Sequence, residues 1–118
     1  MNASGPKTAF RGHTRISQAA LVSIATALAA QQAEVPLDAV QATLHDRDGH
    51  LDLKVSTLLP RQIIEQCRLN PEGGLYELLT QKRHNIAARF EEMTARKVSK
   101  VDLAVTGVKQ PEPEGRVK

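Results

Sequence analysis

Hydrophobic residues recur along residues 18–33 with the spacing of a helix. Leu21 and Leu28 lie two turns apart on one face. Ser17 stands where its hydroxyl can accept hydrogen bonds from the first exposed amides of such a helix. Pro36 then ends the pattern, because its ring lacks an amide hydrogen and disfavours helix in the residue before it. We therefore predict a helix over residues 18–33, with enough alanine for another element to approach closely.

The next two apolar sets alternate with polar residues, as in strands with one buried face. A two-residue turn at Asp48-Gly49 would pair Leu44 with Leu53 and keep both sets on the same side of the sheet. Asp-Gly also suits a turn in which both residues need a positive φ. The pattern predicts a β-hairpin, with these inward residues: Val40, Ala42, Leu44, Leu51, Leu53 and Val55.

The C-terminal half of the chain predicts a long helix followed by a third strand. The segment R-Q-I-I-E-Q-C-R-L after Pro60 fits either a short helix or a loop, and N-P-E-G-G ends it. A helix is predicted over residues 75–96, and a strand over residues 101–106, where Val101, Leu103 and Val105 alternate with the other residues. The apolar side of that helix comprises Leu75, Leu79, Ile86, Phe90 and Met93.

Together these elements predict a single α+β domain over residues 14–109. The order is α-β-β-α-β, and we expect a three-stranded mixed sheet with the two long helices packed on one face. A chain of 118 residues is too short to divide into two domains. Residues 1–13 form a basic arm and residues 110–118 a tail, and the composition of both predicts disorder.

Charge is unevenly distributed along the chain, which has a net charge of +3 and a pI near 9.3. Residues 34–77 hold eight acids and four bases, whereas residues 82–100 hold six bases and two acids. A solvated helix face explains the bases most simply, but they also offer a binding surface, and the acidic side of a second copy would complement it. We predict two interaction groups. The basic cluster comprises Lys82, Arg83, Arg89, Arg96, Lys97 and Lys100, and the acidic hairpin group comprises Asp46, Asp48 and Asp52.

The hairpin segment H-D-R-D-G-H-L-D, residues 45–52, contains the side chains of a metal site. His45, His50 and Asp52 could bind zinc, but Arg47 among them would repel the cation. A calcium loop is excluded because its glycine belongs at the sixth position and a glutamate at the twelfth. We expect a solvated turn with no metal.

The sequence gives little evidence for any other catalytic site. Cys67 is the only cysteine, so neither an internal disulfide nor a cysteine-rich zinc site can form, and a reducing cytoplasm fits best. No histidine has the spacing to a serine or an acid that would mark it as a base. The most apolar stretch, residues 19–30, is too short to cross a bilayer. We expect a cytoplasmic protein that is not an enzyme and has no cofactor or small-molecule substrate.

Three segments resemble the bacterial alkaline shock protein family, also called envelope stress response proteins. They are R-I-S-Q-A-A-L-V-S-I-A near the start, A-E-V-P before the hairpin, and F-E-E-M-T-A-R-K-V-S-K-V-D-L-A-V-T-G-V near the end. Two glycines of the family pattern are replaced, by Leu37 and by Ala95. The resemblance implies a non-enzymatic protein that self-associates and is held at the inner face of the cell membrane by a small membrane-protein partner.

Two other partners fit parts of the sequence. The element order is similar to that of KH-type RNA-binding domains, and N-P-E-G-G stands where such a domain carries its G-x-x-G loop. However, Glu72 would place a negative charge where phosphates approach, and no aromatic residue lies on a predicted strand. Nucleic acid is therefore the weaker alternative. An anionic membrane surface is the third, since the arm carries Lys7, Arg11 and Arg15.

Overall fold

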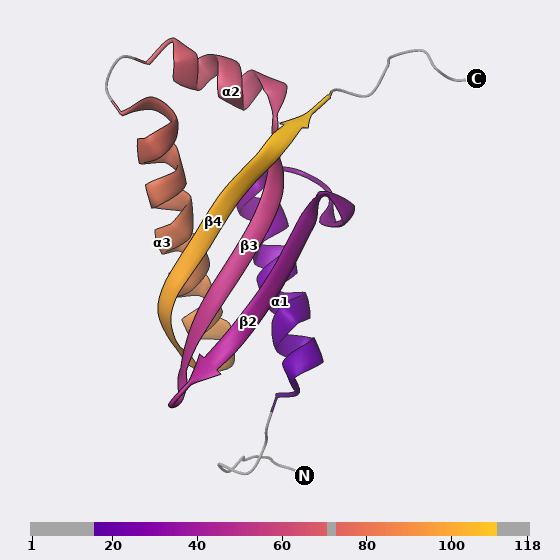
Figure 1. The fold of residues 1–118 in the computed structure, drawn as a ribbon, viewed down its shortest axis with the longest axis vertical. Coiled ribbons are helices and arrows are strands. Elements are labelled where there is room, and N and C mark those ends of the chain that lie inside the picture. Colours follow the sequence, from indigo (N-terminus) through magenta and orange to yellow (C-terminus); the bar gives the residue numbers. More distant parts are fainter. Residues whose placement is uncertain (1–15, 71–72, 111–118) are drawn as a thin grey trace, which may run out of the picture.

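The computed structural model describes residues 16–70 and 73–110. Three helices, one short 3₁₀ turn and three strands follow one another along the chain (Figure 1). In order, they are α1 (Gln18–Ala33), η1 (Leu37–Ala39), β2 (Val40–Arg47), β3 (His50–Pro60), α2 (Arg61–Arg68), α3 (Gly74–Thr94) and β4 (Lys97–Lys109). The predicted arm and all but the first residue of the predicted tail lie outside the described residues.

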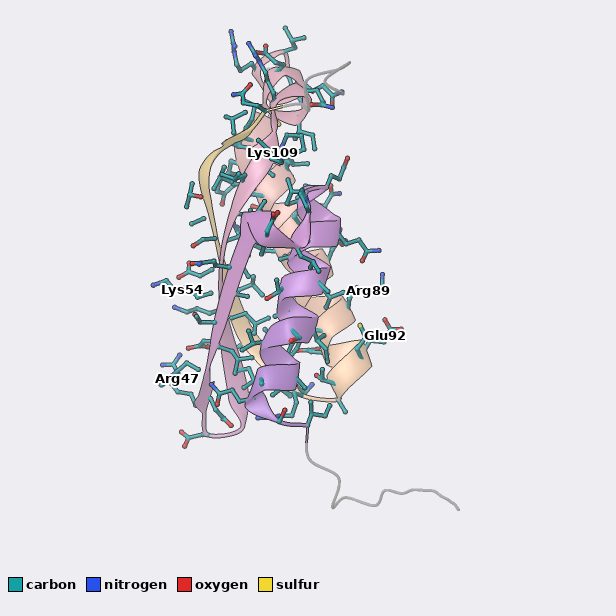
Figure 2. The ribbon with its side chains drawn as sticks, turned by 90° about the vertical axis from the view of Figure 1, so that its right-hand side faces the viewer. Arg47, Lys54, Arg89, Glu92 and Lys109 are labelled. Atoms are coloured by element: carbon teal, nitrogen blue, oxygen red, sulfur yellow. The ribbon has the colours of Figure 1, made fainter. Side chains whose placement is uncertain are left out.

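The three strands form one mixed sheet in the order β2-β3-β4. Strand β2 is antiparallel to β3, and β4 is parallel to β3. Helices α1 and α3 pack behind one face of this sheet, and no described helix covers the other face (Figures 1 and 2). The α+β class, the mixed sheet and the packing of both long helices on one face are therefore confirmed.

The hairpin has the predicted register. Leu44 pairs with Leu53 and Ala42 pairs with Val55, so that both apolar sets face the helices. Asp48 and Gly49 adopt positive φ angles of 52° and 86°. The turn is closed by Asp46, whose Oδ1 accepts a hydrogen bond of 3.0 Å from the Gly49 N–H.

Helix α1 begins and ends close to the predicted residues. The Ser17 hydroxyl oxygen accepts a hydrogen bond of 3.1 Å from the Ala20 N–H, as expected of an N-cap. At the other end Glu34 turns the chain with a φ of 62°. Between these ends, Ala25 is completely buried, which shows how the small side chains of α1 allow close packing on the sheet.

Residues 61–68 form a helix rather than a loop, so the structure decides between the two alternatives for this segment. Helix α2 starts directly after β3, with Pro60 preceding its first turn. Gly73 and Gly74, both with positive φ, then redirect the chain into α3. A Cβ atom at Gly73 would lie 2.8 Å from the Cβ of Glu77, so that turn requires glycine.

The end of α3 and the length of β4 differ from the prediction. Helix α3 ends at Thr94, two residues early, because Ala95 adopts a left-handed conformation. Met93 is 55% exposed and does not belong to the core, where Ile86 and Phe90 are buried. Strand β4 is 13 residues long, whereas only residues 101–106 were predicted. Register shifts interrupt its apolar alternation at both ends of that segment.

Candidate interaction surfaces

The hairpin brings the predicted histidines and acids together as cross-strand pairs. His45 lies opposite Asp52, and Arg47 lies opposite His50. The Arg47 guanidinium also forms an ion pair of 2.9 Å with Asp52. The positive partner of Asp52 is therefore an arginine of the same hairpin. Within the described residues, no group of three or more His, Cys, Asp or Glu side chains could hold a metal ion.

The predicted basic and acidic groups meet within a single copy of the chain. The Arg96 Nη2 donates a hydrogen bond of 3.0 Å to Asp46 Oδ2, across 50 residues of sequence. The same aspartate closes the hairpin turn through its other oxygen. Asp46 therefore stabilises the fold at two points, and its charge is already paired.

The six basic residues do not share one helix face. Lys82, Arg83 and Arg89 lie on α3, Arg96 follows the helix, and the other two lie on β4. Figure 2 shows Arg89 on the helical side of the molecule and Lys54 on the opposite, uncovered side of the sheet. The structure thus divides the predicted basic cluster between two elements and the turn that joins them.

The bases on α3 also have partners within the fold. Lys82 donates a hydrogen bond to the carbonyl oxygen of Gln32 near the end of α1. Arg83 donates a hydrogen bond of 3.0 Å to the Thr80 hydroxyl, and Arg89 lies 3.7 Å from a carboxylate oxygen of Glu92. Because helix C-termini carry partial negative charge, Lys82 stabilises the contact between α3 and α1.

The uncovered face of the sheet carries charges of both signs in adjacent strands. Asp52 on β3 pairs in register with Lys100 on β4, and Lys54 pairs with Asp102. These side chains line a shallow depression of about 420 Å³, together with His45. The Asp52 Oδ1 is shielded from solvent and accepts no hydrogen bond. This face can meet a polar surface, but its charges largely balance.

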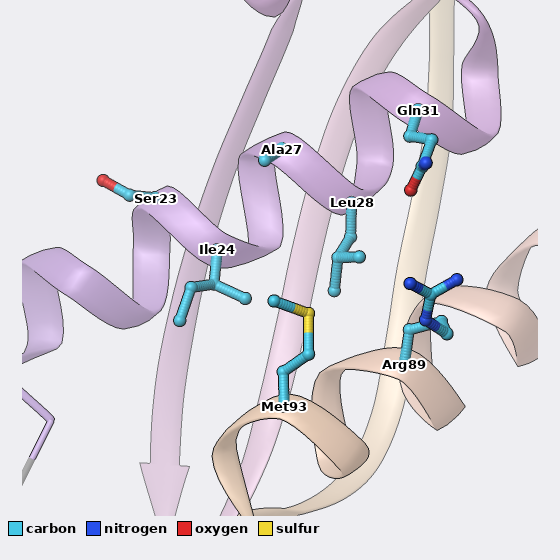
Figure 3. A pocket seen from close by; sticks show the side chains of 7 residues that line it. All are labelled: Ser23, Ile24, Ala27, Leu28, Gln31, Arg89 and Met93. Carbon is cyan, nitrogen blue, oxygen red and sulfur yellow. The ribbon is translucent and has the colours of Figure 1, made fainter.

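A second depression, of about 510 Å³, lies between α1 and α3 on the helical side (Figure 3). Ile24, Leu28 and Met93 form its apolar floor, and Arg89 and Gln31 lie toward one end. The exposed Met93 side chain, which the helical periodicity had placed in the core, belongs to this groove. The exposure of Met93 shows that this side of α3 does not face the sheet at the end of the helix.

Strand β4 is the longer of the two edge strands in the described part of the chain. Strand β4 occupies one edge of the sheet and has a neighbour, β3, on one side only. Its inward residues Val101, Leu103 and Val105 are half-buried, unlike the fully buried Val55 of the central strand. Sequence analysis missed most of this edge, because the register shifts near Ser99 and Thr106 break the two-residue period that marks a strand.

Two further observations concern Cys67 and the lengths of the described helices. Cys67 lies half-buried on α2 as a free thiol. Helices of the described segments are either too short or too polar to span a bilayer.

Comparisons with known proteins identify no family for this chain. No protein-family model and no curated protein matches it. Among solved structures, the chain is similar to a variant of Era from Aquifex aeolicus bound to GDP·AlF4⁻, with 18% sequence identity and a TM-score of 0.49. The similarity covers 89% of this chain and 36% of the Era chain.

Proposed function

We propose that the protein is a non-enzymatic interaction module that binds other proteins, including its own copies, through the open edge of β4. The observation that carries this proposal is the position of β4 at the edge of the sheet, with 13 residues and no described strand on its outer side. Beyond Val98, whose N–H donates to Glu91, such an edge presents backbone N–H and C=O groups that a further strand can use.

The arrangement of charges supports binding rather than chemistry. Two of the three acids of the hairpin are paired with arginines, Asp46 with Arg96 and Asp52 with Arg47. The residues that resemble the alkaline shock family end in β4 itself, in V-S-K-V-D-L-A-V-T-G-V. A self-associating, envelope stress response protein held at the membrane by a small membrane protein agrees with this placement.

Two measurements test the proposal. Sedimentation velocity from micromolar to millimolar concentration should show reversible self-association. Capture from cytosolic and membrane fractions should then be repeated with a competing peptide of residues 97–109, using a peptide of the same composition in shuffled order as the control. We expect the first peptide alone to release the partners. A strictly monomeric chain whose captured proteins resist the peptide would refute the proposed function.

RNA binding is a second candidate, favoured by one observation. Helices α2 and α3 connect the parallel strands β3 and β4, the arrangement expected of a KH-type domain. However, Lys82 and Arg83 are engaged with Gln32 and Thr80. RNA binding requires an affinity that falls steeply with salt and is lost when Lys82, Arg83 and Arg89 are replaced by Gln. A titration with labelled RNA that meets both conditions would establish this function instead.

A further inference from the structure

We infer that the groove between α1 and α3 binds an amphipathic helix of another protein, and that this helix carries a carboxylate about two turns from its first apolar contact. The inference goes beyond the proposed function, because the groove opens on the helical side of the molecule, with the sheet behind it (Figure 3). A helix seated in this groove leaves the edge of β4 free. The two surfaces are therefore open to separate tests.

The exposed side of α1 is unusual for a helix at a protein surface. All 16 residues of α1 are uncharged, and those exposed to solvent are Gln18, Ala19, Ser23, Ala27 and Gln31. A surface helix normally carries charged residues on the face that meets water. Small neutral side chains instead allow a second helix to approach within an axial distance of about 8–10 Å, and no charge of α1 loses its water in the contact.

The floor of the groove is apolar over about two helical turns. Leu28 is buried, Ile24 is half-buried, and Met93 reaches toward both of them from α3 (Figure 3). Methionine is flexible and adapts to the shape of an apolar partner. From Ile24 to Gln31 the axis of α1 advances by about 10 Å, so a helix lying along it contacts this floor with residues spaced by three or four positions.

Two polar side chains converge at one end of the groove. The Arg89 guanidinium and the Gln31 side chain point toward each other from the two helices (Figure 3). Within the described residues they form no hydrogen bond with each other, and Arg89 lies 3.7 Å from its acidic neighbour Glu92. A guanidinium offers paired N–H donors to a carboxylate, and the Gln31 amide adds a further donor. This end of the groove therefore favours an acidic residue of the partner.

The shape and charge of the groove select this occupant over others. The groove is open to solvent, whereas sites for small molecules enclose most of their ligand. A helix is wide enough to contact both walls at once. The N-terminal arm of the chain has three bases and no acid in residues 1–15, so it would meet Arg89 with like charge. An acidic amphipathic helix satisfies both the apolar floor and the arginine.

A display library of helical peptides tests this partner chemistry. Peptides of about 16 residues are long enough to form a helix, and the positions of one face would be randomised. On the full-length wild type we expect selection of apolar residues spaced by three or four positions, followed by an aspartate or glutamate one turn further. On Arg89→Glu the same selection should replace this acid with lysine or arginine. A wild type that selects no such pattern overturns the inference.

The affinity of one selected peptide measures each part of the groove. Arg89→Glu should raise the Kd by about five- to thirtyfold, whereas Arg61→Glu on α2, an exposed residue outside the groove, should change it by less than about twofold. Ala27→Glu places a charged side chain in the groove and should abolish binding. Ala88→Glu on α3 is its matched control, because Ala88 is exposed but does not line the groove. Thermal melting verifies that each variant is folded.

The methyl group of Met93 reports directly on the groove. The chain has two methionines, Met1 and Met93, so methyl labelling of methionine gives a single NMR signal from this site. We expect the selected peptide to shift the Met93 signal in the wild type but not in Ala27→Glu. A signal that changes with protein concentration alone would assign the groove to a second copy, and one that changes on Phe10→Ala would assign it to the arm. Either result overturns the inference.

Competition separates this inference from the proposed function. The peptide of residues 97–109 should not displace the selected helix, because the two bind different surfaces. Displacement would place the helix at the edge of β4 and overturn the groove as its site. Partners that respond to the β4 peptide, in a protein that selects no helix, support the proposed function and refute the groove. A selected helix that shifts Met93, in a protein without such partners, does the reverse.

Discussion

At the scale of single residues, two of the helices are followed by a residue in a conformation that normally favours glycine. Glu34 after α1 and Ala95 after α3 have φ angles of 62° and 60°. A side chain at such a φ costs about 1 kcal/mol. Ala95 is held there by its neighbours, because its N–H donates a bond of 2.8 Å to the Glu91 carbonyl and the Arg96 N–H donates to the Thr94 hydroxyl.

Replacing Ala95 with glycine should therefore stabilise the protein. We expect Ala95→Gly to raise the free energy of unfolding by about 0.5–1 kcal/mol, after allowance for the greater freedom of glycine in the unfolded chain. Urea denaturation measures the change. Leu37→Gly is the matched control, because Leu37 does not have a positive φ and should lose stability when replaced. An equal loss in both variants would contradict strain at Ala95.

Asp46 contributes to the fold through both of its carboxylate oxygens. Asp46→Ala removes the turn bond to Gly49 and the ion pair with Arg96, and it should lower the free energy of unfolding by about 1–2 kcal/mol. Asp46→Asn can keep the turn bond and should cost less than about 1 kcal/mol, because the ion pair is partly exposed. Thermal or urea denaturation of the two variants side by side would show whether the turn bond dominates.

The hairpin shows which features can be predicted from the sequence. Its register followed from the Asp48-Gly49 turn and from the spacing that puts Leu44 and Leu53 on the same face of the sheet. Both features depend only on residues that are close together in the sequence. The bond between Asp46 and Arg96 could not be predicted. Its partners are 50 residues apart, and only the packing of α3 against the sheet brings them together.

At the scale of elements, the start of β4 is attached to the end of α3 by a side chain. The Glu91 Oε2 accepts a hydrogen bond of 2.8 Å from the Val98 N–H. Within α3, the buried Thr94 hydroxyl donates a bond of 2.7 Å to the Phe90 carbonyl and so supports the last turn. These contacts fix where the edge strand begins and which of its residues face the helices.

Loss of the Glu91 carboxylate should loosen this attachment. We expect Glu91→Ala to lower the free energy of unfolding by about 1–2 kcal/mol, since it leaves the half-buried Val98 N–H without its acceptor. Hydrogen exchange at residues 97–100 should speed up more than exchange in β3. Glu92→Ala on the next residue is the control, because its carboxylate is exposed and contacts only Arg89, and its effect should stay within about 0.5 kcal/mol. Similar behaviour of the two variants would exclude the proposed attachment.

The full length of β4 was not predicted for a physical reason. Strand prediction depends on an unbroken period of two, and an extra residue in the strand reverses that period beyond it. Ser99 and Thr106 do so at the two ends of the regular segment, so the pattern identified residues 101–106 alone. The helical periodicity placed Met93 in the core for a related reason, since it assumes that the helix packs along its whole length.

At the scale of the whole molecule, two forms of self-association make different demands on the same chain. A head-to-tail contact between the basic cluster and the acidic hairpin group would need Asp46 and Arg96 to exchange their internal partner for one in another copy. Pairing along β4 beyond Val98 needs no such exchange, because no described strand occupies that edge. The fold therefore favours the edge over the charged groups as the self-association surface.

Salt distinguishes these two forms. Backbone hydrogen bonds and apolar side chains carry an association along β4, and salt screens neither of them. We expect the Kd of self-association through this edge to change by less than about twofold between about 20 mM and 500 mM NaCl. A head-to-tail contact between opposite charges would weaken over the same range. Sedimentation equilibrium at several salt concentrations measures the Kd, and a Kd that rises steeply with salt would assign self-association to the charged groups instead.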